Sequence, residues 1–552
     1  MICKIMNIFS PKLFTDLKGY TSKQLITDLV AGLIVAIIAL PLSIALAIAS
    51  GVSPEKGLYT AIVAGFVIAV LGGSKVNISG PTAAFATIVA GIVAQYGVSG
   101  LALATVMAGI ILIIMGLCRL GALIKFIPYT ITTGFTSGIA LTIVIGQLKD
   151  FFGLTFTEGT HAVETIEKLE AVVKSMVTIN WQTIIVGVVA LIILIIWPKI
   201  SKKIPGSLIV VILGAAAVKL LDMEVNTIGD LYSISNTPPK FEVPALSFAL
   251  IKDLLPSAFT IAILAAIESL LSCVVSDGMI GDKHNSNTEL IAQGAGNICS
   301  GLMGGIPATG AIARTAANVK NGGRSPISGM VHAIVLFLIL VVLMPYAAWI
   351  PMPVIAAILF MVAYNMSEWR RFADICKNAP KSDITVLILT FVLTVVFDLV
   401  VAIEIGLLVA LVLFMKRMTD VTYVRTWKRN EENSDDDDGR MKKIPQHTQV
   451  YEINGPMFFA TSDILSAIPI EDGVKVIIIR MRNIPALDIT AMRSIEDMYN
   501  QCSERGINVL FSHVNRQPLS VMRKSGFSER AGEKCFVSNI DEALERAGQI
   551  CV

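Results

Sequence analysis

The sequence predicts an α-helical protein that crosses a membrane many times and ends in a separate α/β domain. Three observations lead to this fold class. Of the 552 residues, 54% are hydrophobic and only 16% are charged, and the mean hydropathy is +0.72, which excludes an ordinary soluble protein. Apolar stretches of about 20 residues, the length that crosses a bilayer, follow one another from residue 28 to residue 416. Beyond them, strand-like and helix-like segments alternate in a more polar sequence.

The apolar stretches divide into fourteen expected spans. The third and the tenth are short and are interrupted by Gly and Pro, which break a helix. Residues 1–24 precede the spans as a cytosolic segment, and the transmembrane domain is expected over residues 25–418. The spans lie near residues 28–50, 57–72, 79–95, 100–117, 125–148, 181–198, 205–221, 255–276, 286–303, 308–319, 326–344, 351–365, 382–398 and 400–416.

The positions of the basic residues predict how the spans are oriented. The turns at residues 96–100, 301–306 and 344–351 contain no Lys or Arg, whereas the loops on the other side hold most of the basic residues. Short cytoplasmic loops are enriched in Lys and Arg. We therefore expect a multi-pass protein of the cell's inner (plasma) membrane with both termini in the cytoplasm.

Two broken segments stand at matching places in the chain. Residues 77–84 and residues 305–310 each belong to the third span of a group of seven. Because seven is odd, the two groups must cross the membrane in opposite orientations, as inverted repeats over about 25–221 and 250–418. Paired broken helices in such repeats point to a substrate site at the middle of the membrane.

Arg314 follows the second broken segment, in a short helix that we expect to begin near Ala308. A helix N-terminus favours anions through its free N–H groups and its dipole, and a guanidinium adds a fixed positive charge. A charged side chain inside a membrane is costly, which favours a functional role, with structural pairing as the alternative. Thr82, Thr309 and Gly310 offer hydrogen-bonding groups and a close backbone approach, or serve only to pack the helices.

Glu268 lies in the apolar run 261–275, where the charged form of a carboxyl is poorly solvated. An acid in this position would take up a proton or bind Na⁺, and would so couple transport to an ion gradient. We favour H⁺, because one carboxylate with few hydroxyl neighbours makes a poor sodium site. The alternative is that Glu268 is the internal counter-ion of Arg314.

A charged linker and a small cytosolic domain follow the membrane part. Residues 419–446 include the acidic run 431–439, which contains no core-forming residues. The alternating segments after the linker predict an α/β domain over residues 447–552. Its strands are expected at 450–453, 474–479 and 506–512, and its helices near 490–504 and 517–525.

Several motifs together carry a resemblance to a known family. They are Ala39-Leu40-Pro41, Ser53 to Tyr59, Ser79-Gly80-Pro81 and Gly305 to Arg314. The chain resembles the SulP anion transporters, the sulfate permease family that includes prestin, over essentially its whole length, including a C-terminal STAS domain. The runs Ala266–Leu271, Asp277–Met279, Lys283–Asn287 and Ile306–Thr309 are most similar to those of bacterial C4-dicarboxylate members.

The resemblance implies a core domain and a gate domain that move as an elevator, usually in a homodimer, with substrate between the N-termini of the third and tenth helices. Thr82 matches the residue that lines the site after Gly-Pro, and Ala313-Arg314 match a Ser-Arg pair of the anion pocket. Glu268 matches a carboxylate tied to cation coupling, and Ser272 a hydroxyl ligand of a sodium-coupled bicarbonate member. The expected substrate-binding residues are Ser79, Gly80, Pro81, Thr82, Ala83, Thr309, Gly310, Ala311, Ala313 and Arg314.

Further positions bear on substrate and regulation. Members that carry sulfate often have Gln and Tyr where this chain has Leu42 and Leu46, which weakens the case for sulfate. In the STAS-like domain, Thr490 matches a position that is phosphorylated in soluble anti-sigma-factor antagonists. The structural alternative in that loop is that Asp488 caps the following helix.

The sequence therefore predicts a secondary active transporter of a small oxyanion, a C4-dicarboxylate, bicarbonate or sulfate, coupled to H⁺ or Na⁺. The rival hypotheses are an anion channel or voltage-driven motor of the same fold, and a membrane sensor that signals through the STAS domain to a cytosolic partner. We expect no enzyme activity, cofactor or nucleic-acid partner, because the chain shows no nucleophile–base pair, phosphate loop or metal-ligand set. Na⁺ at Glu268 and Ser272 is the only metal alternative.

Overall fold

The computed structural model describes residues 9–17, 19–122, 128–156, 164–201, 205–244, 247–397, 399–427, 443–461, 464 and 468–551. The chain forms two compact units, Met1–Leu407 and Leu408–Val552. Most of the predicted linker, residues 428–442, lies outside the described residues, as do residues 1–8 of the predicted N-terminal segment. The two units are considered separately below.

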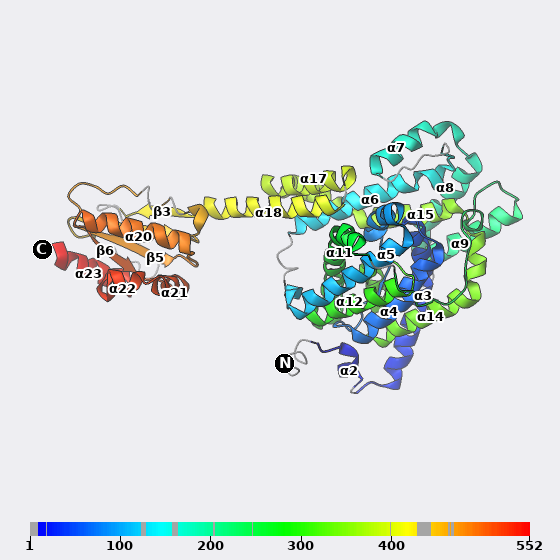
Figure 1. Ribbon diagram of the computed structural model, residues 1–552, viewed down its shortest axis with the longest axis horizontal. Helices are drawn as coiled ribbons and strands as arrows, with labels where there is room; N and C mark the ends of the chain where they lie inside the picture. The colour runs from blue at the N-terminus through cyan, green and yellow to red at the C-terminus, as the bar shows by residue number, and fades with distance from the viewer. Residues whose placement is uncertain are drawn as a thin grey trace. The chain divides into compact units, whose positions relative to one another are not determined.

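The first unit consists mainly of helices, and every predicted span coincides with one of them (Figure 1). The third and fourth spans are the two parts of a single helix, α5, which is interrupted at Gly97, where φ is 68°. α18 runs across the division between the units. The helices at the spans are α3 (Ser22–Ala49), α4 (Pro54–Leu71), α5 (Ala86–Leu117), α6 (Tyr129–Phe152), α8 (Trp181–Ile200), α9 (Gly206–Leu220), α11 (Phe248–Ile280), α12 (Ser286–Leu302), α13 (Ile312–Lys320), α14 (Ile327–Leu343), α15 (Met352–Ser367), α17 (Lys381–Val396) and α18 (Leu399–Asp420).

Short helices and turns connect these spans. They are α2 (Lys12–Asp16), η1 (Ala83–Phe85), α7 (Thr165–Lys174), η3 (Met176–Thr178), α10 (Ile228–Leu231), η4 (Met344–Trp349) and α16 (Trp369–Asn378).

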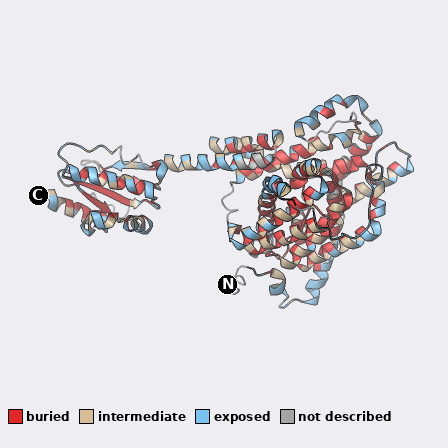
Figure 2. Ribbon diagram, viewed as in Figure 1, coloured by how far each residue is buried: buried red, intermediate tan, exposed pale blue. Residues whose placement is uncertain are grey.

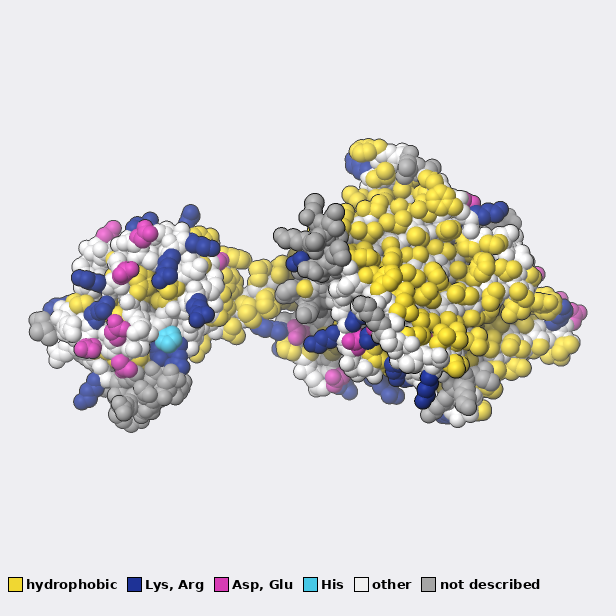
Figure 3. All heavy atoms as spheres, turned by 90° about the horizontal axis from the view of Figure 1, so that it is seen from below, with side chains coloured by type: hydrophobic (Ala, Val, Ile, Leu, Met, Phe, Trp, Pro, Cys, Tyr) yellow, Lys and Arg dark blue, Asp and Glu magenta, His cyan; other side chains and the backbone are white. Residues whose placement is uncertain are grey.

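The surface of this unit is suited to lipid. Among the described residues, eight helices are long and apolar enough to cross a membrane. Figure 3 shows hydrophobic side chains covering a broad face of the unit, and Figure 2 shows that many residues on its helices are exposed. Large apolar side chains such as Ile114 on α5, Ile195 on α8 and Leu338 on α14 are more than half exposed. Exposed apolar side chains in this number are stable only against the hydrocarbon of a bilayer.

Glycines let α5 and α12 approach each other closely, and this contact supports the centre of the unit. A methyl group added at Gly109 would lie 2.6 Å from the carbonyl oxygen of Gly294, and one added at Gly294 would lie 2.5 Å from the carbonyl oxygen of Gly109. Small residues at helix contacts allow such approach in membranes, where the hydrophobic effect does not drive helices together.

The two broken segments meet in the middle of the unit. β1 (Ser79–Gly80) pairs with β2 (Thr309–Gly310) in antiparallel register, with Ser79 opposite Gly310 and Gly80 opposite Thr309. The expectation that the tenth helix begins near Ala308 is wrong, since α13 begins at Ile312. The reason is that the backbone of Thr309 and Gly310 hydrogen-bonds across to β1 and is therefore extended.

The second unit is an α/β domain. Its sheet has the order β3-β4-β5-β6-β7; β3 is antiparallel to β4 and the other neighbours are parallel. The strands are β3 (Tyr423–Thr426), β4 (Thr448–Asn454), β5 (Val476–Asn483), β6 (Asn508–Ser512) and β7 (Phe536–Val537). The helices are η5 (Phe459–Thr461), α20 (Ile489–Glu504), α21 (Arg516–Lys524), α22 (Phe527–Ala531), η6 (Glu533–Cys535) and α23 (Ile540–Cys551).

The expected strands and helices of this domain are confirmed, while β3, β7, α22 and α23 were not predicted. β4 and β5 are buried almost throughout, because apolar side chains pack on both faces of the sheet. Asp488 caps α20, as its side chain accepts a hydrogen bond of 2.8 Å from the amide of Ala491.

The close contact of α5 and α12 leads to a test of the packing. We expect Gly294→Ala to lower the free energy of unfolding by about 1–3 kcal/mol, because its methyl group overlaps the backbone of Gly109. Gly146→Ala in α6 is the matched control: nothing lies within 4 Å of the added methyl group, and alanine favours the helix. Thermal unfolding of the purified protein in detergent should show opposite changes for the two variants. Equal changes would contradict the packing argument.

Candidate functional site

The junction of β1 and β2 places two helix N-termini at one point. Thr82 and Ala311 are the N-cap residues of η1 and α13, and neither caps its helix with a side-chain hydrogen bond. The first amides of a helix have no acceptor within the helix, so both termini present free N–H donors. Such an arrangement suits an anion.

Arg314 lies in the first turn of α13 and is only 3% exposed. Its Nη2 donates a hydrogen bond of 2.9 Å to the carbonyl oxygen of Pro81, while its Nη1 has no partner among the described residues. A methyl group added at Gly80 would lie 2.6 Å from Nη1, so only glycine leaves room for the guanidinium there. A buried donor without a partner is costly and therefore indicates a ligand-binding role.

Glu268 on α11 contacts the same turn from the other side. Thr82 Oγ1 donates a hydrogen bond of 2.9 Å to Glu268 Oε2, and the residue as a whole is intermediate in exposure. Glu268 and Arg314 are both described, and no ion pair within 4.0 Å joins them. In this conformation each group bonds to a different residue of the β1–η1 turn, Glu268 to Thr82 and Arg314 to Pro81, and the counter-ion role of Glu268 stays a prediction.

β2 is attached to α11 through hydroxyl groups. Thr309 Oγ1 donates to the carbonyl oxygen of Ala265 at 3.1 Å and lies 2.8 Å from Ser269 Oγ. The amide of Gly310 donates to Ser269 Oγ at 3.0 Å. The hydroxyl of Thr309 therefore holds the strand in place in this conformation.

Ser272 lies one turn after Glu268 and bonds elsewhere. Its Oγ donates a hydrogen bond of 2.7 Å to Asn77 Oδ1 and lies 3.0 Å from Thr315 Oγ1. Thr315 Oγ1 lies 3.0 Å from the same Asn77 oxygen and accepts from the amide of Ile78 at 3.0 Å. The structure thus brings Ser272 together with Asn77 and Thr315, which sequence reasoning missed, and shows no hydrogen bond to Glu268 among the described contacts.

Glu289 on α12 is a second acid that sequence reasoning missed. It is fully buried, and its carboxylate accepts four hydrogen bonds, from the amides of Gly73 and Ser74 and from the side chains of Asn77 and Gln293. A polar stripe at intervals of four residues marks this face of an otherwise apolar span: Asn285, Glu289, Gln293 and Asn297. That spacing was the available signal.

The remaining predicted residues lie around the same junction. Ser79 accepts a hydrogen bond of 2.9 Å from Gln293 Nε2 through its side chain. Ala83 is buried in the first turn of η1, Ala311 is partly exposed, and Ala313 is exposed. Thr490 is exposed at the start of α20 in the second unit, which is a separate location.

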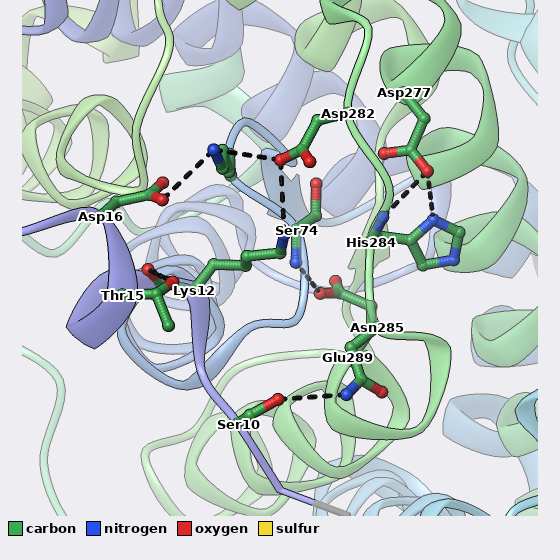
Figure 4. Close-up of polar contacts among 11 residues, drawn as sticks. Ser10, Lys12, Thr15, Asp16, Ser74, Asp277, Asp282, His284, Asn285 and Glu289 are labelled. Carbon is green, nitrogen blue, oxygen red and sulfur yellow. Dashed lines mark hydrogen bonds and ion pairs between the residues drawn. The ribbon is translucent and has the colours of Figure 1, made fainter.

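An ion-pair network lies beyond the C-terminal ends of α4 and α11. Figure 4 shows Lys12 and Asp282 side by side, with Asp16 nearby. Lys12 pairs with Asp282 at 3.3 Å, and Lys75 pairs with Asp282 at 3.1 Å and with Asp16 at 3.3 Å. Ser10 and Asn285 are hydrogen-bonded beside this network, which borders a cavity of about 450 Å³. These contacts hold the segment around α2 against the loops that lead to Asn77 and Glu289.

The network changes the acidity of its members. Burial works to raise the pKa of Asp282, but the amide of Lys283 and the ammonium groups of Lys75 and Lys12 outweigh it and lower that pKa. Burial works to lower the pKa of Lys75, but Asp282 and Asp16 outweigh it and raise that pKa. Both shifts favour the charged pairs.

Known proteins resemble this chain over most of its length. Residues 25–390 match the model of the sulfate permease family, and residues 440–545 match the STAS domain. YvdB of Bacillus subtilis is 38% identical over 95% of this chain and 98% of that protein. Bicarbonate transporter BicA of Picosynechococcus is 30% identical over 94% of each chain. Sulfate transporter 4.1, chloroplastic, of Arabidopsis thaliana is 25% identical over 95% of this chain and 80% of that protein.

Two solved structures show the same fold. The transmembrane domain of a cyanobacterial bicarbonate transporter BicA covers 71% of this chain and 98% of its own, with a TM-score of 0.63 and 30% identity. The murine Solute Carrier 26 family member A9 anion transporter covers 100% of this chain and 95% of its own, with a TM-score of 0.89 and 18% identity. The predicted membrane fold with a C-terminal STAS domain is confirmed.

The ion-pair network around Asp282 yields a prediction about pH. We expect Asp282→Asn to weaken the attachment of residues 9–17 several-fold, because partly exposed ion pairs contribute about 0–1 kcal/mol each. The lowered pKa of Asp282 means that its contribution is present above pH ~4 and is lost as pH falls through the lower folded value. The raised pKa of Lys75 means that its contribution is present below pH ~10 and is lost as pH rises through the higher folded value.

Hydrogen exchange of the Lys12 amide, which donates to the carbonyl oxygen of Gly72, measures this attachment. Its protection factor should be flat between pH ~5 and ~10 in the unaltered protein and lower in Asp282→Asn. Asp253→Asn, at an exposed position of α11, is the control and should change nothing. Equal protection in all three proteins would show that the ion pairs do not hold the segment.

Proposed function

This chain belongs to the sulfate permease family, and we propose from that premise that it is a secondary active transporter of a small oxyanion. Its relatives are named for the transport of bicarbonate and of sulfate. It is therefore an anion transporter of the membrane and not an enzyme. The substrate, the coupling ion and the movement are the parts that we propose.

The observation that carries the proposal is the buried junction of β1 and β2 with the unpartnered Nη1 of Arg314 beside it. Free amides at the starts of η1 and α13 and one fixed cation make a site that is complementary to an oxyanion. Thr82, Ala311 and Ala313 lie at these helix starts, where an anion would contact their backbone. Thr309 and Gly310 support the site through α11.

We propose that Glu268 carries the coupling proton. Its carboxyl lies in an apolar span and accepts a hydrogen bond from Thr82, which belongs to the anion junction. Protonation of Glu268 would therefore directly change a hydrogen bond to a residue of the anion site. Na⁺ is less favoured, because the hydroxyl of Ser272 already bonds to Asn77 and Thr315.

The proposed movement is that of an elevator. The side chains that build the junction come from α11, α12 and α13, and α4 and α14 pack beside them. This set would move as one core against the gate helices, which include α6, α8, α9 and α15. A bound anion drives the change only if its affinity differs between the two states. We further propose a homodimer in the inner membrane with both termini in the cytoplasm, and a regulatory role for Thr490.

The candidate substrates are C4-dicarboxylates, bicarbonate and sulfate. Leu46 is buried in the main core and Leu42 packs against apolar side chains of α8, α9 and α15. These positions thus offer no polar group to a sulfate ion. Uptake of labelled fumarate, bicarbonate and sulfate into proteoliposomes identifies the substrate, and saturable uptake of none of them would overturn the proposed function.

Arg314 and Gly80 test the anion site. We expect Arg314→Gln to raise KM for the transported anion about 10–100-fold, because a hydrogen bond to a charged group contributes about 1.5–3 kcal/mol. Gly80→Ala should have a similar effect by displacing Nη1. Gly91→Ala in α5, where nothing lies within 4 Å of the added methyl group, is the control and should keep the normal KM. A normal KM in Arg314→Gln would exclude contact between Arg314 and substrate.

Glu268 tests the coupling. We expect Glu268→Gln to weaken strongly the stimulation of uptake by an inward H⁺ gradient, because an amide cannot release a proton. Exchange of labelled for unlabelled anion should remain, since the anion site itself is kept. Asp253→Asn, on an exposed part of the same helix, is the control. Uptake by Glu268→Gln that still responds fully to the gradient would instead favour a different proton carrier or the channel hypothesis.

A further inference from the structure

His332 is a buried titratable residue that the proposed function does not use. It lies on α14, is 0% exposed, and both of its ring nitrogens lack a partner among the described residues. The rest of that helix, Ile327–Leu343, contains no charged residue. A buried imidazole with two unpartnered nitrogens is costly and calls for a functional explanation.

Contacts along α14 show which way His332 faces. Ser328, one turn earlier, accepts a hydrogen bond of 2.9 Å from Asn318 Nδ2 on α13. A methyl group added at Gly329 would lie 3.0 Å from Ala69 on α4 and 3.6 Å from Ile78 beside β1. The face of α14 that carries Ser328, Gly329 and His332 is therefore turned toward the junction of the broken segments.

Arg314 approaches the same place from α13. Arg314 lies one turn before Asn318 on α13, and His332 lies one turn after Ser328 on α14. Each residue is therefore one helical turn away from the hydrogen bond between Asn318 and Ser328. The guanidinium reaches Gly80, where an added methyl group would also lie 3.5 Å from Ala61 on α4. Ala61, Gly65 and Ala69 lie on one face of α4, and this face is contacted at Ala69 by Gly329 of α14 and near Ala61 by the turn at Gly80 that holds the guanidinium.

The charges around His332 are few. Arg314 is the charged residue that the Asn318–Ser328 contact brings to the level of His332. The other titratable groups on the elements packed against α14 lie away from this level. Asp28 on α3 bonds to Ser325 and Arg324, Tyr59 on α4 to Thr237, and Lys56 to Gly304. The remaining ones are Lys23 on α3, Glu55 on α4, Tyr346 on η4 and Lys320 on α13.

We propose that His332 is a second anion-binding residue, which takes up a proton together with the substrate and makes the site select dianions over monoanions. This inference rests on the proposed transport function and names the substrate class of the same site. The chemical class is a dianion, such as a dicarboxylate or sulfate.

The electrostatics explain the selection. Beside Arg314, a second positive charge on His332 is unfavourable in the empty site, because the two cations repel each other in a region of low dielectric. A dianion bound at Arg314 Nη1 reverses the local field and favours the imidazolium. Binding of the proton and of the dianion must then strengthen each other by the same factor. A monoanion is already neutralised by Arg314 alone and gains less.

The first test compares substrates. We expect His332→Gln to raise KM for sulfate or fumarate about 10–100-fold at pH 6.5, close to the ordinary pKa of His, and to leave KM for bicarbonate or formate within about 2-fold. The fall of dianion uptake with rising pH should also become shallower. The matched control is Thr133→Val in α6, which removes another buried side-chain oxygen that lacks a partner.

The second test counts protons. Titration calorimetry of the purified protein in buffers of different ionisation enthalpy should show that sulfate or fumarate binding takes up about one proton at His332 near neutral pH. This uptake should persist in Glu268→Gln and be lost in His332→Gln. His332→Phe, which keeps a planar ring without a titratable nitrogen, should behave like His332→Gln.

The outcomes separate the two proposals. If the unaltered protein transports none of these anions saturably, the proposed function fails. If it transports them and His332→Gln keeps the same dianion preference, pH profile and proton uptake, the role of His332 is overturned while the proposed function stands.

Discussion

The backbone pairing of β1 with β2 is the constraint on which the membrane unit depends. Two segments that cannot be helical, because of Gly and Pro, lie where water cannot satisfy their polar groups. Each segment therefore supplies hydrogen-bond partners to the other, and the amide of Ala311 adds a further bond of 2.8 Å to the carbonyl oxygen of Ile78. The same pairing leaves the first amides of η1 and α13 free. The β1–β2 pairing thus satisfies the polar backbone groups inside the membrane and, at the same time, leaves the free amides that form the anion site.

The two halves of the chain contribute unequally to this junction. The first half supplies backbone, as in Gly80 and Pro81, together with the side chains of Asn77, Ser79 and Thr82. The second half supplies most of the side chains that hold it: Ser269 and Ser272 from α11, Glu289 and Gln293 from α12, and Arg314 from α13. The paired strands therefore give the junction its backbone frame, and unequal side chains give the site its charge.

Much of the fold follows from local chemistry. The spans were predictable because hydrocarbon demands long apolar helices, and the α/β domain because its buried strands are short apolar runs between amphipathic helices. The start of α13 was misplaced, since Ala308 and Thr309 carry no local signal that distinguishes a helix start from a strand. Gly97 likewise joins two spans into one interrupted helix because a single glycine accommodates the turn.

By itself, the sequence determined the class of protein, its domain order, and the residue types expected at the site: a broken helix pair, one arginine and one acid. These follow from composition, spacing and motif, which are local properties. Only the tertiary structure decided which groups meet. In the structure, Arg314 donates a hydrogen bond to Pro81 and not to Glu268, and Ser272 donates one to Asn77. The structure also shows that the carboxylate of Glu289 is buried and hydrogen-bonded to Asn77. Those choices depend on contacts between residues far apart in the chain, since a buried polar group bonds to whatever donor or acceptor the packing brings within reach.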